Sequence, residues 1–315
     1  MTQLQITLII VGSILVLGLI VSIILTMYIA SQVYKGTLTR KDANHWGRTV
    51  SFPDNEEQVK IWDIGLEWAK NNKASMKEVS ITSFDNLKLV GEYYDFGNNR
   101  SVIILPGRCE SLCYSYYYAK PYQDAGYNVL VIDARAHGLS EGKYNTCGLN
   151  ESKDIIQWAN YLHDNFNQEK VSLHGICVGG GGALLAMTSK YASPYFDKLI
   201  VDGLFVSFKK IYSYHFKDQG HKLFPVYYEV WIWMKIKTGL SARKSNPLKV
   251  AKRLNNPVLF LYSKEDKYSI SKKSMDLYNE CSCEKQIHWF EHGIHSHVRF
   301  NNTEEYDQTV IDFVK

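Results

Sequence analysis

The opening stretch of the chain is uniformly apolar. No Asp, Glu, Lys or Arg occurs before Lys35, and Ile6 to Ala30 form one hydrophobic run. As a helix that rises ~1.5 Å per residue, a run of this length crosses the ~30 Å hydrocarbon core of a bilayer with some tilt. A cleaved signal peptide is the alternative, but it would carry a charged n-region and an apolar core of only about 7–15 residues. The pattern predicts an uncleaved transmembrane anchor over residues 1–34.

The following segment, residues 35–77, has a different pattern. Residues 35–53 are polar and predict a spacer. Glu57 to Asn71 contains apolar residues at mixed spacing, which predicts a helix packed on the main domain. We therefore expect a chain that starts near Thr49 to be soluble and active without its anchor.

Short apolar runs alternate with helical stretches through residues 78–315. Strands are predicted at Val79–Ser83, Leu87–Tyr94, Val102–Leu105, Val129–Ile132, Val171–Leu173, Leu199–Val201, Val258–Tyr262 and Gln286–Phe290. Helices are predicted at Tyr116–Ala125, Asn150–Asn165, Gly180–Lys190 and Ser271–Glu280. This alternation indicates an α/β domain with a mostly parallel eight-stranded sheet and helices on both faces. The site of such a sheet lies beyond the carboxyl ends of its strands.

Composition excludes several classes of protein. With 45% hydrophobic and 22% charged residues in 315, the chain is neither disordered nor a small disulfide scaffold. A formal net charge of +4 gives no nucleic-acid footprint. The cations that follow the apolar run favour a cytoplasmic domain on a single-pass cell-membrane anchor: Lys35, Arg40, Lys41 and Arg48. The chain has six cysteines, and a reducing compartment suits the free thiolate argued for below.

Cys177 has the most specific chemical context. The stretch from Val171 to Gly180 reads as a strand, a tight turn and a helix, with Gly175 and Gly179 two residues on either side of the cysteine. A nucleophile at such a corner is exposed above the sheet, and the helix N-terminus favours an anion. The alternative is that Cys177 is a small buried hydrophobe. We predict that it is a catalytic nucleophile in a G-x-S-x-G pattern with Cys in place of Ser.

These residues resemble the α/β-hydrolase superfamily across Glu78 to Lys315. The run Gly126 to Gly142 is similar to its D-x-R-G-H-G-x-S-x-G motif, and Leu105 to Arg108 follows the third strand, where the superfamily usually has His-Gly and where Gly107 would serve the turn. The departures from the pattern are Pro106 for His, Ala136 for Gly and Cys177 for Ser. With its apolar N-terminus the chain resembles membrane-anchored single-domain hydrolases of Gram-positive bacteria. The cysteine resembles that of dienelactone hydrolases.

The resemblance places the acid after the strand that ends at Tyr262. The run Ser263 to Ile270 is similar to the superfamily's G-x-x-D-x-x-V-P turn, which implies that Asp266 is the triad carboxylate. Glu265 is its near competitor. Asp202 is a second candidate, because some members place the acid after that strand.

The base should come last in the chain. Gly293-Ile294-His295-Ser296 resembles the G-x-H-S turn of many hydrolases, so that Cys177, Asp266 and His295 follow the order nucleophile, acid, base. His292 and His297 flank this turn. Metal binding by the four late histidines counted from His288 is the alternative, but no Cys or carboxylate sits among them at zinc-finger or zincin spacing.

The implied mechanism is acyl transfer to Cys177 without a metal or cofactor. Backbone N–H groups of Val178 and Arg108 should stabilise the oxyanion, and aromatic residues in a lid at about 205–246 should shape a pocket for a small-molecule acyl substrate. Hydrolysis of esters or thioesters is the leading prediction. The alternatives are an acyltransferase using the same cysteine, a degenerate binding protein, and a Cys177 that replaces an original Ser. The sequence leaves the natural substrate and the oligomeric state open.

Overall fold

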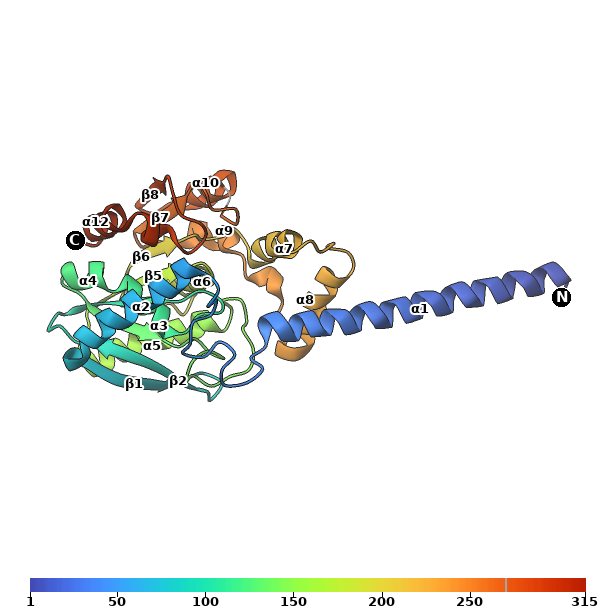
Figure 1. The fold of residues 1–315 in the computed structure, drawn as a ribbon, viewed down its shortest axis with the longest axis horizontal. Helices are drawn as coiled ribbons and strands as arrows, with labels where there is room; N and C mark the ends of the chain where they lie inside the picture. Colours follow the sequence, from blue (N-terminus) through green and yellow to red (C-terminus); the bar gives the residue numbers. More distant parts are fainter. Residues whose placement is uncertain (270) are drawn as a thin grey trace.

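Eight strands form one sheet at the centre of the computed structural model, which describes residues 1–269 and 271–315 (Figure 1). The strand order is β1-β2-β4-β3-β5-β6-β7-β8, in which β1 and β2 pair antiparallel with their neighbours and β3 to β8 are parallel. The strands are β1 (Met76–Thr82), β2 (Lys88–Tyr94), β3 (Arg100–Leu105), β4 (Asn128–Ile132), β5 (Lys170–Ile176), β6 (Phe196–Asp202), β7 (Val258–Ser263) and β8 (Lys285–Phe290). The predicted mostly parallel sheet is confirmed.

Helices cover both faces of this sheet because its central strands are apolar on both sides. Val102 and Ile104 of β3 pack in one core cluster, and Ile103 and Leu105 pack in the other. The helices of the first face are α2 (Glu56–Asn71), α3 (Leu112–Ser115), α4 (Lys120–Asp124) and α12 (Thr303–Val314). Those of the second face are α5 (Glu151–Phe166), α6 (Val178–Met187), α9 (Pro247–Val250) and α10 (Ser271–Glu280). The short helix α11 (Val298–Asn301) precedes α12.

The single helix predicted at Tyr116–Ala125 is wrong. The chain there forms α3, a 3-10 turn at Tyr116–Tyr118 and α4. Pro121 lies in the first turn of α4. Proline lacks the N–H that would continue a preceding helix, so the segment is broken into short pieces.

The N-terminal helix α1 (Gln3–Leu38) is longer than the apolar run and projects from the domain (Figure 1). Within the described residues it is the one helix long and apolar enough to cross a membrane. Its last turns are part of the domain, because Ala30, Tyr34 and Leu38 are buried in the core.

The sequence predicts a spacer over residues 35–53, but residues 35–38 belong to α1 and residues 39–50 pack on the loop that follows β4. Trp46 is buried and stacks on His137 with ring centroids 4.7 Å apart. Arg48 pairs with the buried Asp133 at 3.0 Å. Arg40 donates to the carbonyl oxygen of Gly138 at 2.6 Å. The segment is therefore a structural strap between α1 and the sheet.

The insertion between β6 and β7 is helical. It contains α7 (Phe208–Asp218), α8 (Val226–Thr238) and a 3-10 turn at Ala242–Lys244. These elements span the region in which the sequence predicts a lid. In Figure 1, α8 crosses α1 near the point where α1 reaches the domain.

Candidate active site

Cys177 occupies the sharp turn between β5 and α6. As the residue before Val178 it has φ 49° and ψ −106°, a conformation that costs energy for any residue other than glycine. The flanking glycines are required sterically. A Cβ on Gly175 would lie 2.3 Å from the Gly180 nitrogen, and a Cβ on Gly179 would lie 2.3 Å from the Leu105 carbonyl oxygen. The thiol is thus held at a strained corner at the N-terminus of a helix, where negative charge is favoured.

His295 and Asp266 form a hydrogen-bonded pair. Nδ1 of His295, in the loop after β8, lies 2.7 Å from Oδ2 of Asp266, in the loop after β7. Oδ1 of Asp266 accepts the backbone N–H groups of Tyr268 (2.7 Å) and Ser269 (3.0 Å). The Asp266 carboxylate is an acceptor, so it holds the proton of His295 on Nδ1 and leaves Nε2 for chemistry. Nε2 of His295 is buried, and it has no hydrogen bond to a nitrogen or oxygen atom of the described residues.

The electrostatics of this pair favour charge separation. Burial disfavours the protonated form of His295, but Asp266 and the neighbouring Cys177 outweigh it and raise the pKa of His295 well above its usual value. Burial also opposes ionisation of Asp266, yet His295 and the two backbone bonds lower the pKa of that carboxyl. A carboxylate–imidazolium pair beside a cysteine is the arrangement that stabilises a thiolate.

The loop after β3 is held rigidly. Nε2 of His137 lies 2.5 Å from the carbonyl oxygen of Arg108, and the N–H of Gly107 donates to Oε2 of Glu110 at 3.0 Å. A Cβ on Gly107 would lie 2.8 Å from that same Glu110 oxygen, so glycine is needed here. Val178 is the first residue of α6, and its N–H therefore has no carbonyl partner within the helix.

A cavity of about 380 Å³ brings these groups together. Arg108, Cys177, Val178 and His295 line it. The lid helix α7 forms a largely apolar wall with Phe208, Ile211, Tyr212 and His215. A volume of this order accommodates a small acyl group.

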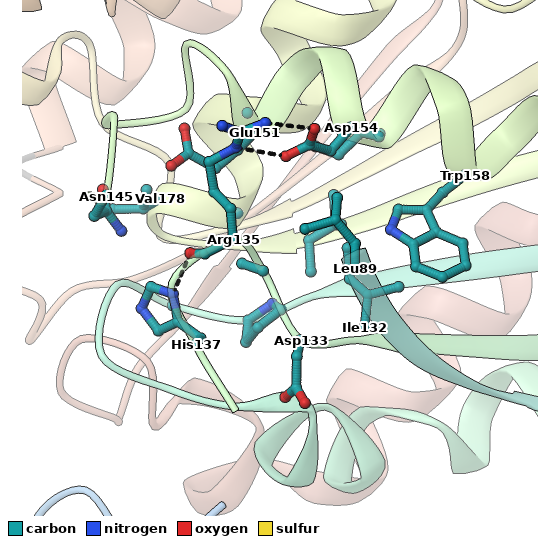
Figure 2. Close-up of a pocket in the computed structure, with 17 residues that line it drawn as sticks. Leu89, Ile132, Asp133, Arg135, His137, Asn145, Glu151, Asp154, Trp158 and Val178 are labelled. Carbon is teal, nitrogen blue, oxygen red and sulfur yellow. Dashed lines mark hydrogen bonds and ion pairs between the residues drawn. The ribbon is translucent and has the colours of Figure 1, made fainter. Parts of the chain in front are cut away.

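A smaller cavity of about 30 Å³ lies behind the loop of Gly107 and the start of α6 (Figure 2). Arg135 forms a buried two-bond ion pair there with Asp154, both bonds 2.7 Å long, and its carbonyl oxygen lies 2.8 Å from Nδ1 of His137. This space is of the size that one or two waters fill. The ion pair fixes the turn that carries His137, and through it the carbonyl of Arg108.

Comparison with known proteins identifies this architecture. Residues 100–204 match the family model described as the alpha/beta hydrolase fold. The esterase Pf2001 of Pyrococcus furiosus is similar in structure with a TM-score of 0.63 and 23% identity, over 78% of this chain and 92% of that one. The chain has the α/β-hydrolase fold.

Two further proteins show the extent of the similarity. The esterase EaEST of Exiguobacterium antarcticum matches this hydrolase fold with a TM-score of 0.56 and 17% identity, over 75% of this chain and 98% of that one. The uncharacterized protein YqkD of Bacillus subtilis is 29% identical over 219 residues, which cover 68% of this chain and 70% of that protein. The family match includes Arg108 and Cys177 and ends before Asp266 and His295.

The competing acids occupy different places in the hydrolase fold. Asp202, at the end of β6, accepts a bond from the Tyr306 hydroxyl at 2.9 Å, and burial raises its pKa to about 7. Glu265 accepts the N–H of Gly293 at 2.8 Å and so holds the histidine turn from outside. The structure brings Asp266, rather than either of these, to the imidazole of His295. Ile270, the last residue of the predicted acid turn, lies outside the described residues.

The neighbouring histidines are bonded to groups other than Asp266, although His297 also lines the cavity that contains Cys177. His292 is exposed and lies 3.2 Å from Glu265. His297 contacts Glu57 and Gln58 of α2, each at 2.7 Å. Each late histidine thus has partners of its own, and the described residues contain no group of three or more His, Cys, Asp or Glu side chains placed to hold a metal.

Several residues of the site were not anticipated from the sequence. Tyr268 lies against His295 with ring centroids 5.5 Å apart, and His215 of the lid stacks on Tyr268 at 3.8 Å. Burial and the charge of His295 lower the pKa of His215 to about 4, so it is neutral. Glu110 is partly buried beside the loop of Arg108 and bonded to its Gly107 N–H, and desolvation raises its pKa. No motif marks these residues, because they meet only through tertiary packing.

Proposed function

We propose that the protein is a membrane-anchored hydrolase that cleaves acyl esters or thioesters through a Cys177–His295–Asp266 triad. The observation that carries this proposal is the presence of Cys177, on its strained turn, in one cavity with an imidazole bonded to a buried carboxylate. The similarity to proteins named as esterases supports the reaction class.

The first half-reaction would transfer the acyl group to sulfur. The thiolate, paired with protonated His295, attacks the substrate carbonyl carbon and forms a tetrahedral adduct. The N–H groups of Val178 and Arg108 donate to the oxyanion, and loss of one such donor typically costs ~3–4 kcal/mol of barrier. Collapse of the adduct breaks the bond to the leaving oxygen or sulfur, which takes the proton from Nε2 of His295. The product of this step is a thioester on Cys177.

The second half-reaction would release the acid. Neutral His295 accepts a proton from water at Nε2 while the water oxygen attacks the thioester carbonyl. Collapse of the second adduct expels the Cys177 thiolate and restores the imidazolium. Asp266 keeps the ring orientation and tautomer constant through both steps. A thioester also reacts with amines and thiols, so the same intermediate serves an acyltransferase.

The anchor is proposed from α1. The charge-free, largely exposed part of α1 before Lys35 supports a single membrane crossing, and the cations from Lys35 onward support a cytoplasmic catalytic domain.

The test is a panel of acyl esters and thioesters of graded chain length, assayed with the full chain and with Cys177→Ala. We expect turnover of at least one ester or thioester series by the wild type and its loss, by ~10³-fold or more, in Cys177→Ala. Undiminished turnover in Cys177→Ala would rule out the cysteine mechanism. Failure of the wild type on every substrate would favour the degenerate binding protein.

A further inference from the structure

Helix α8 of the insertion carries an apolar face that no element in the described part of the chain covers. Tyr228, Ile232 and Ile236 recur every four residues and are 51%, 48% and 59% exposed, and Phe224 just before the helix is 81% exposed. The opposite side of α8 is buried in the core through Val230 and Met234. An isolated exposed apolar residue is ordinary, whereas three on one line along a helix, with a fourth just before the helix, indicate a contact surface.

This stripe lies next to the contact between α8 and α1. Nε1 of Trp233 donates to the carbonyl oxygen of Met27 at 2.9 Å, and the Thr26 hydroxyl donates to Glu229 at 2.9 Å. Glu229 directly follows Tyr228, and Trp233 directly follows Ile232. The stripe therefore lies next to the side of α8 that contacts α1. Because α8 crosses α1 (Figure 1), its apolar face continues from the anchor.

The length of the exposed part of α1 indicates where its contact with α8 would lie relative to a bilayer. Residues 3–25 of α1 precede Thr26 and Met27, which hydrogen-bond to α8, and they are exposed almost throughout. At ~1.5 Å per residue they extend for about 34 Å, which matches the ~30 Å hydrocarbon core. The core of the membrane would therefore end close to Thr26 and Met27, which is where α8 crosses.

Charge points to the same surface. The lid, residues 205–246, contains eight Lys or Arg residues and two Asp or Glu residues, although the whole chain has a net charge of only +4. Of the two acids, Glu229 is bonded to α1. Lys235 and Lys237 flank Ile236 on α8. An apolar stripe bordered by cations is the pattern of a helix lying in the interface of an anionic bilayer.

We propose that α8 is an interfacial helix whose stripe of Phe224, Tyr228, Ile232 and Ile236 dips into the anionic membrane surface, and that the catalytic cavity takes acyl amphiphiles held in that membrane. The proposal rests on the membrane-anchored hydrolase proposed above. It adds the class of substrate and the side from which the substrate arrives.

The route from α8 to the cavity is short. Trp231 of α8 packs on Tyr212 of α7 with centroids 5.1 Å apart, and Tyr212 lines the cavity. The Tyr212 hydroxyl also lies 2.8 Å from the hydroxyl of Thr37 on α1. Thr37 is ten residues beyond Met27, or ~15 Å further along the helix. Since the polar interface adds ~5–7 Å to each side of the core, a membrane-held ester needs to rise only ~10 Å to reach the cavity.

The first test requires no activity. The full chain is placed in vesicles of phosphatidylcholine with phosphatidylglycerol, and a photoreactive benzoylphenylalanine replaces Ile232 or Ile236. Ile64 on α2 is the matched control, because it is 47% exposed against 48% for Ile232 and belongs to a helix of the main domain. We expect lipid adducts at positions 232 and 236 and only background at 64. Background at all three positions, or crosslinks from 232 to a second chain instead of lipid, would overturn the proposal.

The second test separates the substrate class from the chemistry. Ile232→Glu should lower hydrolysis of a long-chain ester held in vesicles by ~10-fold or more and leave a soluble short-chain ester within ~2-fold, because only the first must leave a bilayer. Ile64→Glu should change neither rate. An equal loss on both substrates in Ile232→Glu, or no loss on either, contradicts the proposal. If the wild type hydrolyses neither ester, the proposed function fails while the crosslinking pattern still decides whether α8 meets lipid.

Discussion

The guanidinium of Arg108 donates to the carbonyl oxygen of Thr37 at 2.8 Å, which joins the loop expected to stabilise the oxyanion to the last turns of α1. Arg108 is partly buried and also lines the cavity that contains Cys177 and His295. The strap that follows α1 also contacts this loop indirectly. Trp46 stacks on His137, and His137 is hydrogen-bonded to the Arg108 carbonyl oxygen. The N-terminal helix is thus part of the framework of the candidate active site as well as the proposed anchor.

This relationship changes the expected effect of truncation. A chain starting at Thr49 loses Tyr34 and Leu38, which are 2% and 0% exposed, together with the Arg108 contact and Trp46. Removing large buried side chains costs ~2–5 kcal/mol each, so we expect the Tm to fall by about 10 °C or more and ester turnover to fall with it. A chain starting at Thr26 keeps these contacts and should retain both in detergent. Equal Tm and activity for the two truncations, measured by calorimetry and ester assay, would show that the strap is dispensable.

Cys177 should react before the other cysteines. All six lie in the described part of the chain as free thiols. Burial raises the pKa of Cys113 to about 11 and that of Cys281 to about 12, and it also raises those of Cys109, Cys147 and Cys283. These five are protonated and slow at neutral pH, whereas Cys177 lies beside His295, whose pKa is raised well above its usual value by Asp266 and Cys177 despite the opposing effect of burial. Brief labelling with iodoacetamide at pH 7, followed by peptide mapping, should find Cys177 modified first. Faster labelling of Cys283, which is partly exposed, would count against a catalytic thiolate.

The histidine turn gives a prediction with internal controls. His295→Ala should lower kcat/KM by ~10²–10⁴-fold, because it removes the general base. His292→Ala should be close to wild type, since that side chain is exposed. His297→Ala should reduce the Tm through loss of its bonds to Glu57 and Gln58, with a much smaller effect on turnover. An inactive His292→Ala beside an active His295→Ala would shift the assignment of the base by three residues.

Substitutions of Asp202 and of Asp266 should affect stability and turnover differently as pH changes. The folded-state pKa of Asp202 is raised to about 7 by burial, so the folded protein binds a proton there that the unfolded chain releases above about pH 4. The free energy of unfolding therefore loses a contribution from Asp202 as pH rises from about 4 to 7. Asp202→Asn should remove this loss. Its Tm should therefore exceed that of the wild type at pH 8, and the difference in Tm should be much smaller at pH 5. Turnover should be largely kept.

Asp266 provides the contrasting substitution. Burial opposes ionisation of Asp266. His295 and two backbone N–H groups outweigh burial, so the folded-state pKa of Asp266 is lowered. Its stabilising contribution is therefore present at neutral pH and lost as pH falls below the ordinary carboxyl range. Asp266→Asn should lower kcat by ~10²-fold or more through the wrong imidazole tautomer. Loss of turnover in Asp202→Asn with normal turnover in Asp266→Asn would reverse the assignment.

The features that could be predicted from sequence are those with local causes. Gly175 and Gly179 flank Cys177 because the backbone packs too closely there for a Cβ, and that requirement is visible within five residues. The apolar strands were likewise visible, with ends displaced by a few residues. Contacts such as Trp46 with His137 and Gln58 with His297 join distant segments and have no local signature. The polar residues after α1 were interpreted as a spacer for this reason, although Arg40 and Arg48 are tied to the loop after β4.

The most direct test of the central claim is the site of acylation. The full chain is mixed with an acyl ester that it turns over, quenched in acid during the steady state, and mapped by mass spectrometry of its peptides. We predict an acyl group on the peptide that contains Cys177, removable by neutral hydroxylamine and missing in Cys177→Ala. Steady turnover with the acyl group on another residue, or an acylated Cys177 that never releases its acid, would contradict the account.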